Sequence, residues 1–208
     1  MTVKLSTIPL AHLPPPHNTL YVALFTDLEN GQDLREQLLA GNPEFEYAFV
    51  NCDTVVSTTH VLASCFRSVN DLQNTRLRSK NVHSEIVFGL GTNNNIATSL
   101  KTFGVDADTK HLLAVKVSNA ASMRPDDERD QIQQHLEANV KGKSLPFTDE
   151  FIGALTDWAK VRKTYKLSEI GSDKSARKQK QSDAIILSQD EKNEAEIAIL
   201  GLIALRGS

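Results

Sequence analysis

The stretch "STTHVLASCFRSVNDL", from Ser57 to Leu72, is the clearest single element of the sequence. Its apolar side chains recur at steps of one, three and four residues, which places them on one face of an α-helix. Members of this stripe are Val61, Leu62, Cys65, Phe66, Val69 and Leu72. A hydroxyl oxygen of Ser57 or Thr58 can cap the first turn. We therefore predict an amphipathic helix that packs on a core.

Three apolar segments elsewhere in the chain read as strands. The run from Leu20 to Phe25 hardly alternates with polar residues, which is typical of a central strand covered on both faces. The segments Phe45 to Val50 and His111 to Val117 are shorter candidates. Between the first two, "DLREQLLAG" has leucines at helical spacing and ends at Gly41, a residue that suits the end of a helix.

Further helices are expected downstream. The segment "HSEIVFGL" leaves strand and helix both open, because short apolar runs do not reveal their period. A short helix is predicted from Ile96 to Phe103, followed by a longer one with acidic residues in its first turn and two short ones before Leu167. The pattern predicts an α+β (mixed α/β) fold: a single compact domain over residues 1–167, with a small, largely antiparallel or mixed sheet packed by helices.

Composition changes after this domain. Residues 168–188 are polar, charged and almost free of large apolar side chains, so we expect a flexible linker. Ser188 and Glu191 then form a capping-box pattern at the start of a C-terminal helix within residues 189–208. Its apolar residues cover more than one face, so one face can dock on the core domain while another stays free for a partner. Complete burial of this helix inside the protein is the alternative.

Bulk properties narrow the class of protein. The chain has 208 residues, a net charge of −3 and two cysteines without a CxxC partner. We therefore expect neither a uniformly basic surface nor a zinc or disulfide framework. The scarcity of cysteine also indicates a protein of a reducing compartment. The N-terminal residues do not resemble a signal peptide, and no apolar run approaches the length of a membrane span. A soluble intracellular protein without a membrane partner is the expectation.

The glycine–asparagine segment "GLGTNNN" raises the question of a phosphate site. A Walker loop needs a lysine followed by serine or threonine, and Asn94 stands where GxGxxG has its third glycine. The segment is better explained as a turn in which Asn94 or Asn95 caps the next helix. No nucleotide or other cofactor is expected.

The other candidates for chemistry are equally weak. No two histidines have the i, i+4 spacing of a helical metal site, and no metal is expected. His60 and His83 fit surface positions or local hydrogen bonds, and Cys65 belongs to the apolar stripe described above. We predict no catalytic residues and no enzymatic activity.

Basic residues gather in three clusters on this net-acidic chain. One includes Arg76, Arg78 and Lys80, a second runs from Lys160 to Lys166 beside Trp158, and the third lies in the predicted linker. A solvated surface explains any single cluster. Together they suggest that positive charge is segregated to one side, as contact with a nucleic-acid backbone requires.

The segment "HSEIVFGLGTNNNIATSLKTFGV", followed by "TKHLLAVKV", resembles the PRPK-binding protein (TPRKB) family, the small regulatory subunit of the KEOPS/EKC complex. The shared pattern is Ser-Glu-Ile, a few mostly apolar residues, Asn-Asn-Asn-Ile, a short helix and Phe-Gly. Supporting matches are "LYVALFTDLENGQDLREQLLAG", "VNCDTVVSTTHVLASCFRSV" and "KVRKTYKL", and "AILGLIALRGS" resembles the ending of fungal-type members. The resemblance covers Leu20 to Leu167 and the final helix, whereas the long polar segment from Ser168 departs from shorter members.

This resemblance implies a non-catalytic protein that binds the small atypical PRPK-type kinase/ATPase of the complex and, through it, the threonylcarbamoyl-transferase subunit. The assembly makes threonylcarbamoyladenosine at position 37 of tRNAs, and the family is connected with tRNA recruitment through the 3′ CCA end and, in fungi, with telomeres. Localisation in nucleus and cytoplasm is expected. A stand-alone RNA-binding or adaptor α/β domain is the alternative.

Two sets of residues follow from combining the residue patterns with the resemblance. The expected kinase-binding residues are Val61, Phe66, Ile197, Leu200, Leu202, Ile203 and Leu205. The expected tRNA-binding residues are Arg76, Arg78, Lys80, Asn93, Asn94, Asn95 and Lys101. In the second set, asparagine amides would contact bases or backbone while the cations hold phosphates.

Overall fold

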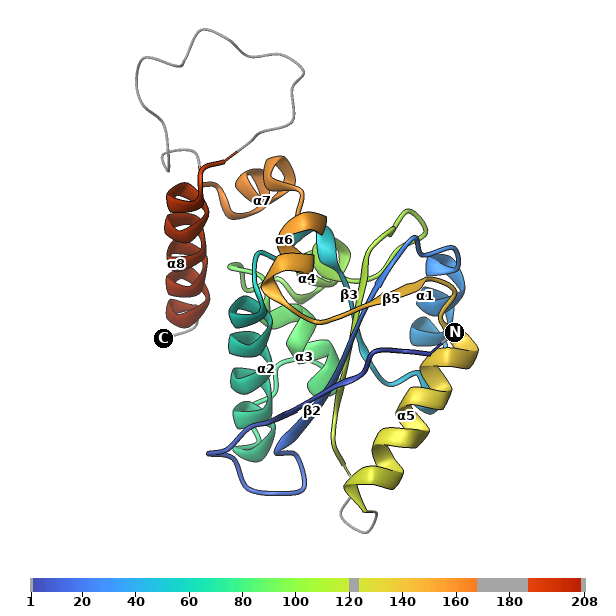
Figure 1. The fold of residues 1–208 in the computed structure, drawn as a ribbon. Coiled ribbons are helices and arrows are strands. Elements are labelled where there is room, and N and C mark those ends of the chain that lie inside the picture. The colour runs from blue at the N-terminus through green and yellow to red at the C-terminus, as the bar shows by residue number, and fades with distance from the viewer. Residues whose placement is uncertain (1, 120–123, 168–186, 207–208) are drawn as a thin grey trace, which may run out of the picture.

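A sheet of five antiparallel strands forms the centre of the protein in a computed structural model that describes residues 2–119, 124–167 and 187–206 (Figure 1). The strands are β1 (Ser6–Pro9), β2 (Thr19–Thr26), β3 (Ala48–Asn51), β4 (Leu112–Val117) and β5 (Lys143–Leu145). Their order is β1-β2-β4-β3. Because β4 pairs along β2 from Leu20 to Phe25, β1 and β5 share the other edge of β2, one after the other.

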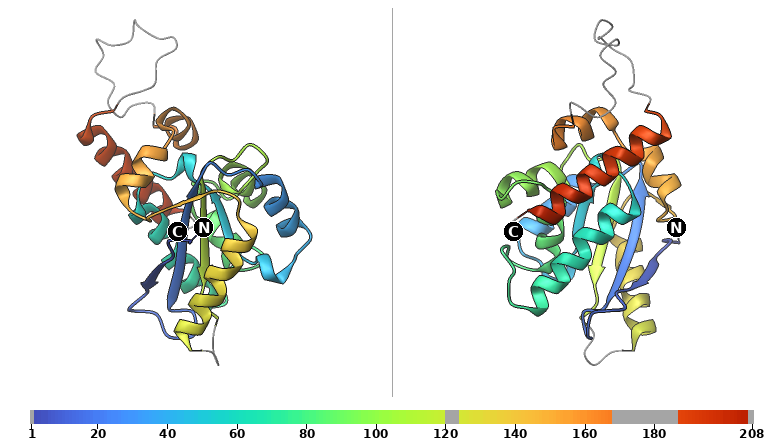
Figure 2. Two further views of the ribbon diagram at one scale, coloured as in Figure 1. Left: turned by 45° about the vertical axis from the view of Figure 1, so that its right-hand side comes forward. Right: turned by 90° about the vertical axis from the view of Figure 1, so that its left-hand side faces the viewer.

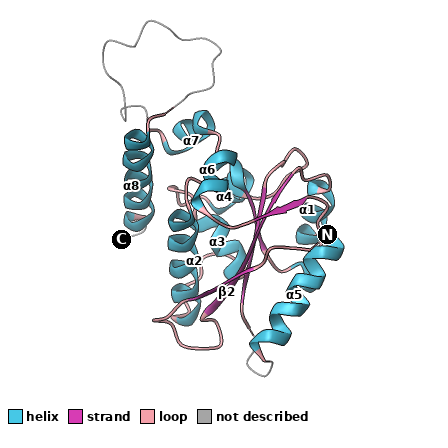
Figure 3. Cartoon of the chain, viewed as in Figure 1, coloured by secondary structure: helices cyan, strands magenta, loops and turns pink. Residues whose placement is uncertain are grey.

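Helices cover both faces of this sheet (Figure 3). The helices are α1 (Gly31–Leu39), α2 (Thr58–Gln73), α3 (Val82–Gly89), α4 (Ile96–Phe103), α5 (Pro125–Asn139), α6 (Asp149–Leu155), α7 (Trp158–Tyr165) and α8 (Gln189–Leu205), with short 3₁₀ turns η1 (Pro43–Phe45) and η2 (Cys52–Thr54). Figure 2 shows α1 and α5 on one side of the sheet and α2, α3 and α8 on the other.

The central strand β2 explains this two-sided arrangement. Successive side chains of a strand point to opposite faces, so Leu20, Val22 and Leu24 join one core cluster. Tyr21, Ala23 and Phe25 join the other. The first cluster also contains buried residues of α2, α3 and α7, and the second contains buried residues of α1 and α5. A strand covered on both faces has no need for alternating polar residues, which accounts for its continuous apolar run.

The predicted α+β fold is confirmed, and each of the three predicted strands overlaps an observed one. The ambiguous segment "HSEIVFGL" is helical and lies mostly in α3, and Phe45 belongs to η1 rather than to a strand. The short edge strands β1 and β5 were not predicted. Most of the predicted linker, residues 168–186, lies outside the described residues.

The C-terminal helix α8 packs beside α2 (Figure 2). Its capping box is present, because Ser188 and Glu191 each bond the backbone of the other. Ala195, Ile199 and Ile203 form its buried face. Among the described residues, no helix is long and apolar enough to cross a lipid bilayer.

Candidate binding surfaces

Gly89 and Gly91 allow close packing between helices. A Cβ atom at Gly89 would collide with Oγ of Ser64, which is buried and donates a hydrogen bond to the carbonyl of Ile86 at 2.7 Å. A Cβ at Gly91 would lie 2.6 Å from Oγ of Ser99. Both glycines keep the segment between α3 and α4 close to its neighbours. This packing accounts for the two glycines without a bound phosphate.

The asparagine loop, defined here as Asn93–Asn95, is exposed and ordered by its own side chains. Asn95 is the N-cap of α4 and accepts from the backbone N–H of Thr98 at 3.0 Å, so the second of the two predicted caps is the correct one. Asn93 accepts from the backbone N–H of Asn95 at 2.9 Å, and Asn94 accepts from Nη1 of Arg78 at 3.1 Å. The amide of Asn94 and the positive charge of Arg78 therefore lie close together on one exposed surface.

Glu85 holds the segment that carries two of the predicted cations. Its buried carboxylate accepts from the backbone N–H groups of Arg78 and Ser79, at 3.1 and 2.7 Å, and from Oγ of Ser79 at 2.6 Å. Charged acceptors form the stronger class of hydrogen bond, so this carboxylate fixes the backbone just before Lys80.

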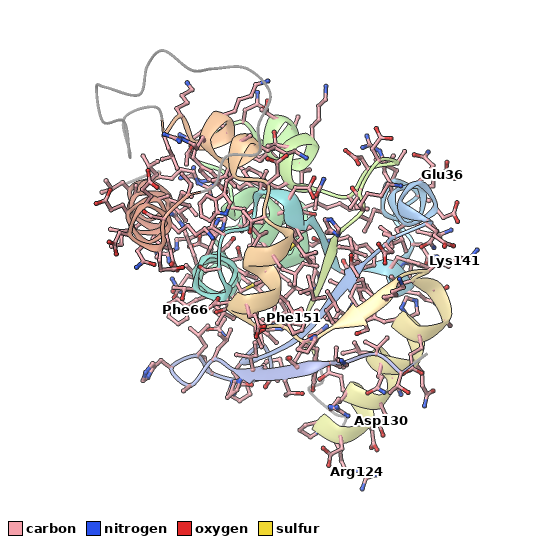
Figure 4. All side chains as sticks on the ribbon, turned by 45° about the horizontal axis from the view of Figure 1, so that its top comes forward. Glu36, Phe66, Arg124, Asp130, Lys141 and Phe151 are labelled. Carbon is pink, nitrogen blue, oxygen red and sulfur yellow. The ribbon has the colours of Figure 1, made fainter. Side chains whose placement is uncertain are left out.

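A cavity of about 540 Å³ opens beside Lys80, and we call it the α1–α4 groove. Its lining includes apolar side chains of α1 and α4, among them Leu39 and Leu100, and three aromatic rings, those of Phe45, Tyr47 and Phe49. The cations in the lining are Arg35, Lys80 and Lys101. Figure 4 shows α1, labelled by Glu36, at the outer edge of the molecule. The lining also contains the acidic residues Glu46 and Asp106, so the groove combines aromatic and apolar walls with three cations and two carboxylates.

The aromatic side of the groove is rigid. Tyr47 and Phe49 stack with ring centroids 5.2 Å apart, and the ring of His135 stacks on Tyr47 with centroids 5.4 Å apart. Nζ of Lys116 lies 4.9 Å from the Tyr47 ring centroid, within the range of a cation–π interaction. These contacts hold the rings against one another on this side of the groove.

His83 lines the same groove and is a neutral hydrogen-bond acceptor. Its Nε2 accepts from the backbone N–H of Val117 at 3.1 Å, which leaves the ring proton on Nδ1. Burial, with Lys116 as a secondary cause, lowers the pKa of His83 from 6.5 to about 3. Within the described residues Nδ1 has no hydrogen-bond partner. The lining therefore includes a histidine with an unused polar atom.

The outer side of α8 carries exposed apolar residues on a helix whose opposite side is buried. Ile197 and Leu205 are 71% and 72% exposed, and Leu202 is 41% exposed. From α2, Phe66 is 43% exposed, and Figure 4 shows it on the surface of that helix. We call these four side chains the α2–α8 face.

The family of the chain is decided by sequence comparison. The sequence model of the family described as "Kinase binding protein CGI-121" matches residues 25–207. The chain belongs to the CGI-121 family. Relatives named "EKC/KEOPS complex subunit CGI121" from Coccidioides immitis and Aspergillus fumigatus are 43% and 42% identical, over 96% and 100% of both chains. A relative of the same name from Schizosaccharomyces pombe is 26% identical over 73% of this chain and 84% of its own.

These comparisons confirm the resemblance to the small KEOPS/EKC subunit that the asparagine segment suggested. The positions of the expected kinase-binding residues in this CGI-121 chain are mixed. Phe66, Leu202 and the outer residues of α8 reach the surface, and Leu200 is half-buried. Val61 and Ile203 lie in the core instead, so they support the helices from inside and are not part of the α2–α8 face.

Most of the expected tRNA-binding residues lie around one region of the CGI-121 chain. Lys80 and Lys101 line the α1–α4 groove, and Arg78 contacts the asparagine loop. Arg76 forms an ion pair with Asp71 at 3.1 Å. In the second basic cluster, Lys160 is paired with Asp53 at 3.0 Å, which reduces the free charge there.

Several residues of these surfaces were not predicted from sequence. Phe45, Tyr47 and Phe49 alternate along "FEYAF", and this period of two could have indicated a shared aromatic side. No sequence pattern indicated the roles of Glu85 and His83. The partner of His83 is Val117, which is distant in the chain, and Glu85 bonds Arg78 and Ser79 in the turn before α3. Among the described residues there is no group of His, Cys, Asp or Glu that could hold a metal ion.

Proposed function

We propose that this CGI-121 protein is a non-catalytic subunit of an EKC/KEOPS complex that binds the small atypical kinase/ATPase through the α2–α8 face. The observation that carries the proposal is the exposure of Ile197 and Leu205, each above 70%, on a helix that buries one face on the core. Exposed apolar side chains grouped on one element mark protein interaction sites. Through this kinase the protein would join the threonylcarbamoyl-transferase subunit.

The outer side of α8 suits a helix or strand of a partner. Ile197, Gly201 and Leu205 are spaced by four and form one ridge. A Cβ atom at Gly201 would have no neighbour within 4 Å, so the middle of this ridge is open. A partner side chain can enter at Gly201 between the two large apolar residues, and such central anchors carry most of the energy of an interface.

Calorimetry with the purified kinase tests this proposal. We expect Ile197→Glu combined with Leu205→Glu to weaken binding by about 100-fold or more, because each change places a charge in a desolvated contact. Leu39→Glu is the matched control, since Leu39 is 75% exposed on α1, which lies on the other side of the sheet. Unchanged affinity of the folded double variant would remove the α2–α8 face from the proposal.

We infer further that the α1–α4 groove and the asparagine loop contact the single-stranded 3′ end of tRNA. Proteins that bind single-stranded RNA stack bases on aromatic side chains and hold the backbone with cations. The aromatic rings in the lining are each 8% exposed or less, so they could offer an apolar contact to a base but no open stacking surface, and Lys80 and Lys101 could hold the backbone. The volume of about 540 Å³ falls within the range of small-ligand sites, about 300 to 1,000 Å³. The bound tRNA would be the substrate for threonylcarbamoyladenosine formation by the complex.

Binding of tRNA with and without its CCA end tests this second surface. We expect a loss of about tenfold when the CCA end is removed, and a similar loss for Lys80→Gln combined with Lys101→Gln. The two substitutions should also reduce the salt dependence of binding, since each lysine would neutralise a phosphate. Lys163→Gln on the exposed side of α7 is the control. A tRNA affinity that changes neither on removal of the CCA end nor with salt concentration would contradict the inference.

We also propose that the protein is located in nucleus and cytoplasm and has a role at telomeres. These two parts of the proposal are supported by the resemblance to fungal-type members. The alternative function is a stand-alone RNA-binding or adaptor domain. The alternative predicts RNA binding by the purified protein with no affinity for the kinase, and the calorimetric experiment distinguishes the two.

A further inference from the structure

Arg206 follows α8 and is buried, although it carries a charge. Its Nη1 donates to the carbonyl oxygens of Phe88 and Gly91, the second at 2.8 Å, and its guanidinium lies 4.0 Å from the centroid of the Phe88 ring. These carbonyls lie at the end of α3, where the last carbonyl groups of a helix lack intrahelical partners and carry the negative end of the helix dipole. Arg206 thus caps α3 from a position 115 residues beyond Gly91.

The segment that Arg206 caps leads directly into the asparagine loop. Only one residue, Thr92, separates Gly91 from Asn93. Other side chains hold the same segment from different sides: the hydroxyl of Tyr165 on α7 donates to the carbonyl of Leu90 at 3.1 Å. The backbone before the asparagine loop is therefore fixed by contacts from α7 and from the end of α8.

The main chain of Arg206 is itself fixed by α2. Arg67 donates from Nη1 to the carbonyl of Ile203 at 2.6 Å and from Nη2 to the carbonyl of Arg206. A chain of contacts therefore runs from α2 through the end of α8 to the end of α3. Docking of α8 alone would not require a buried charge, because an apolar side chain at this position would avoid the cost of desolvation. Both hydrogen bonds come from Nη1, while the planar guanidinium lies over the ring of Phe88, and an arginine side chain provides the two kinds of contact together.

We propose that Arg206 is a positioning residue that makes the shape of the asparagine loop, and hence RNA binding in the α1–α4 groove, depend on the docked state of α8. This inference rests on the proposed RNA-binding function. Arg206 touches no RNA in this account and acts through the carbonyls of Phe88 and Gly91. A kinase bound to the outer side of α8 would hold that helix in place and so favour the RNA-binding geometry, and by linkage RNA would favour kinase binding to the same extent.

The full-length Arg206→Gln variant tests the inference with two measurements. The first is affinity for a short single-stranded RNA that ends in CCA, which we expect to fall at least tenfold. The second is amide hydrogen exchange, which we expect to become faster at Asn95 and Thr98, whose N–H groups bond within the loop. Amides of α5, on the other face of the sheet, serve as the internal reference and should not change.

Ile199→Ala is the matched control. Ile199 is fully buried on α8, so its truncation weakens the packing of the helix but leaves the contacts of Arg206 in place. We expect this variant to lose overall stability while keeping most of its RNA affinity and its loop exchange rates. Equal loss of RNA affinity in both variants would overturn the role of Arg206, because helix docking in general would then explain the effect.

Two further outcomes are decisive. Wild-type RNA affinity and loop exchange in Arg206→Gln would overturn the inference. If the wild-type protein binds no RNA, the proposed RNA-binding function fails, while hydrogen exchange still shows whether Arg206 orders the loop. Arg206→Lys should keep only part of the affinity, since an ammonium can donate to the carbonyls but lacks the planar guanidinium that lies over the ring of Phe88.

Discussion

His60 and His83 show how far single residues can be interpreted from sequence. Their positions near the start of predicted elements suggested surface placement or local hydrogen bonds. Surface placement is wrong, because both side chains are buried. Local hydrogen bonding is correct for His60, whose Nδ1 accepts from the backbone N–H of Val56 at 3.4 Å. Its Nε2 contacts the hydroxyl of Tyr165 at 3.2 Å, and nothing in the sequence could have indicated a partner 105 residues away.

The buried histidines predict acid sensitivity. Burial lowers the pKa of His60 from 6.5 to about 4, and that of His83 to about 3. Well above pH 6.5 both are neutral in the folded and unfolded states, so they cause no pH dependence there. As pH falls from 6.5 towards 3, the unfolded chain takes up protons that the folded chain cannot, and stability decreases. At pH 5 the expected loss is about 2 kcal/mol for each histidine.

Urea denaturation at pH 7.5 and pH 5 measures this loss. His12→Gln serves as the control, because His12 is exposed and its replacement should leave the pH dependence intact. His60→Gln should reduce it. A folding free energy that is the same at both pH values would contradict the assignment of these histidines as neutral and buried.

At the scale of elements, α3 marks the limit of periodicity as a guide. Nearly every residue of this helix is buried, including His83, Glu85 and Phe88. A helix buried on all sides has no apolar stripe, so strand and helix could not be distinguished. The cap was a local signal that could have decided it, since Asn81 accepts from the backbone N–H of Ser84 at 2.8 Å.

The contact between α2 and α3 predicts a specific cost for a small substitution. Gly89→Ala introduces a methyl group that collides with Oγ of Ser64, and we expect a loss of about 1–3 kcal/mol in the free energy of unfolding. The collision is with one atom, so Ser64→Ala in the same chain should recover part of the loss. A double-mutant cycle by chemical denaturation measures this coupling, and strict additivity would show that the two residues do not meet.

For the C-terminal helix, the sequence predicted where the helix begins but not which of its sides packs on the core. The start of α8 was correctly predicted from Ser188 and Glu191, because a capping box is local. The apolar excess correctly indicated that a single face would not hold every apolar side chain. Which side faces inward depends on α2, whose Arg67 fixes the last carbonyls of α8, and this contact spans 136 residues.

At the scale of the whole molecule, the sheet was predicted in its centre and missed at its edges. The apolar run of β2 is long enough to be recognised as a strand from sequence, since β2 has eight residues. In contrast, β1 has four residues and β5 three, which is too few for a clear pattern. Strands so short exist through their pairing with β2, which the sequence does not encode locally. The candidate groove shares this limitation, because its walls come from α1, η1, β3, α3 and α4.

Removal of α8 is expected to affect the molecule as a whole. Truncation after Leu167 deletes Ala195, Ile199 and Ile203 from the core cluster and uncovers part of the side of α2 that they pack against. We expect a lower melting temperature and loss of kinase affinity, together with weaker RNA binding because Arg206 is lost as well. Circular dichroism and calorimetry measure these effects. A truncated protein with wild-type stability would contradict the packing of α8 on the core.

Both described ends of the chain are anchored, and this has a practical consequence for fusion proteins. The backbone N–H of Val3, which is buried, donates to Oε1 of Glu137 at 2.9 Å, and Arg206 is buried at the other end. Only two residues would separate an affinity tag or fluorescent reporter joined after Ser208 from the buried Arg206. Labels inserted within the polar sequence 168–186 avoid both anchors, and they are preferable for measurements of complex assembly in cells.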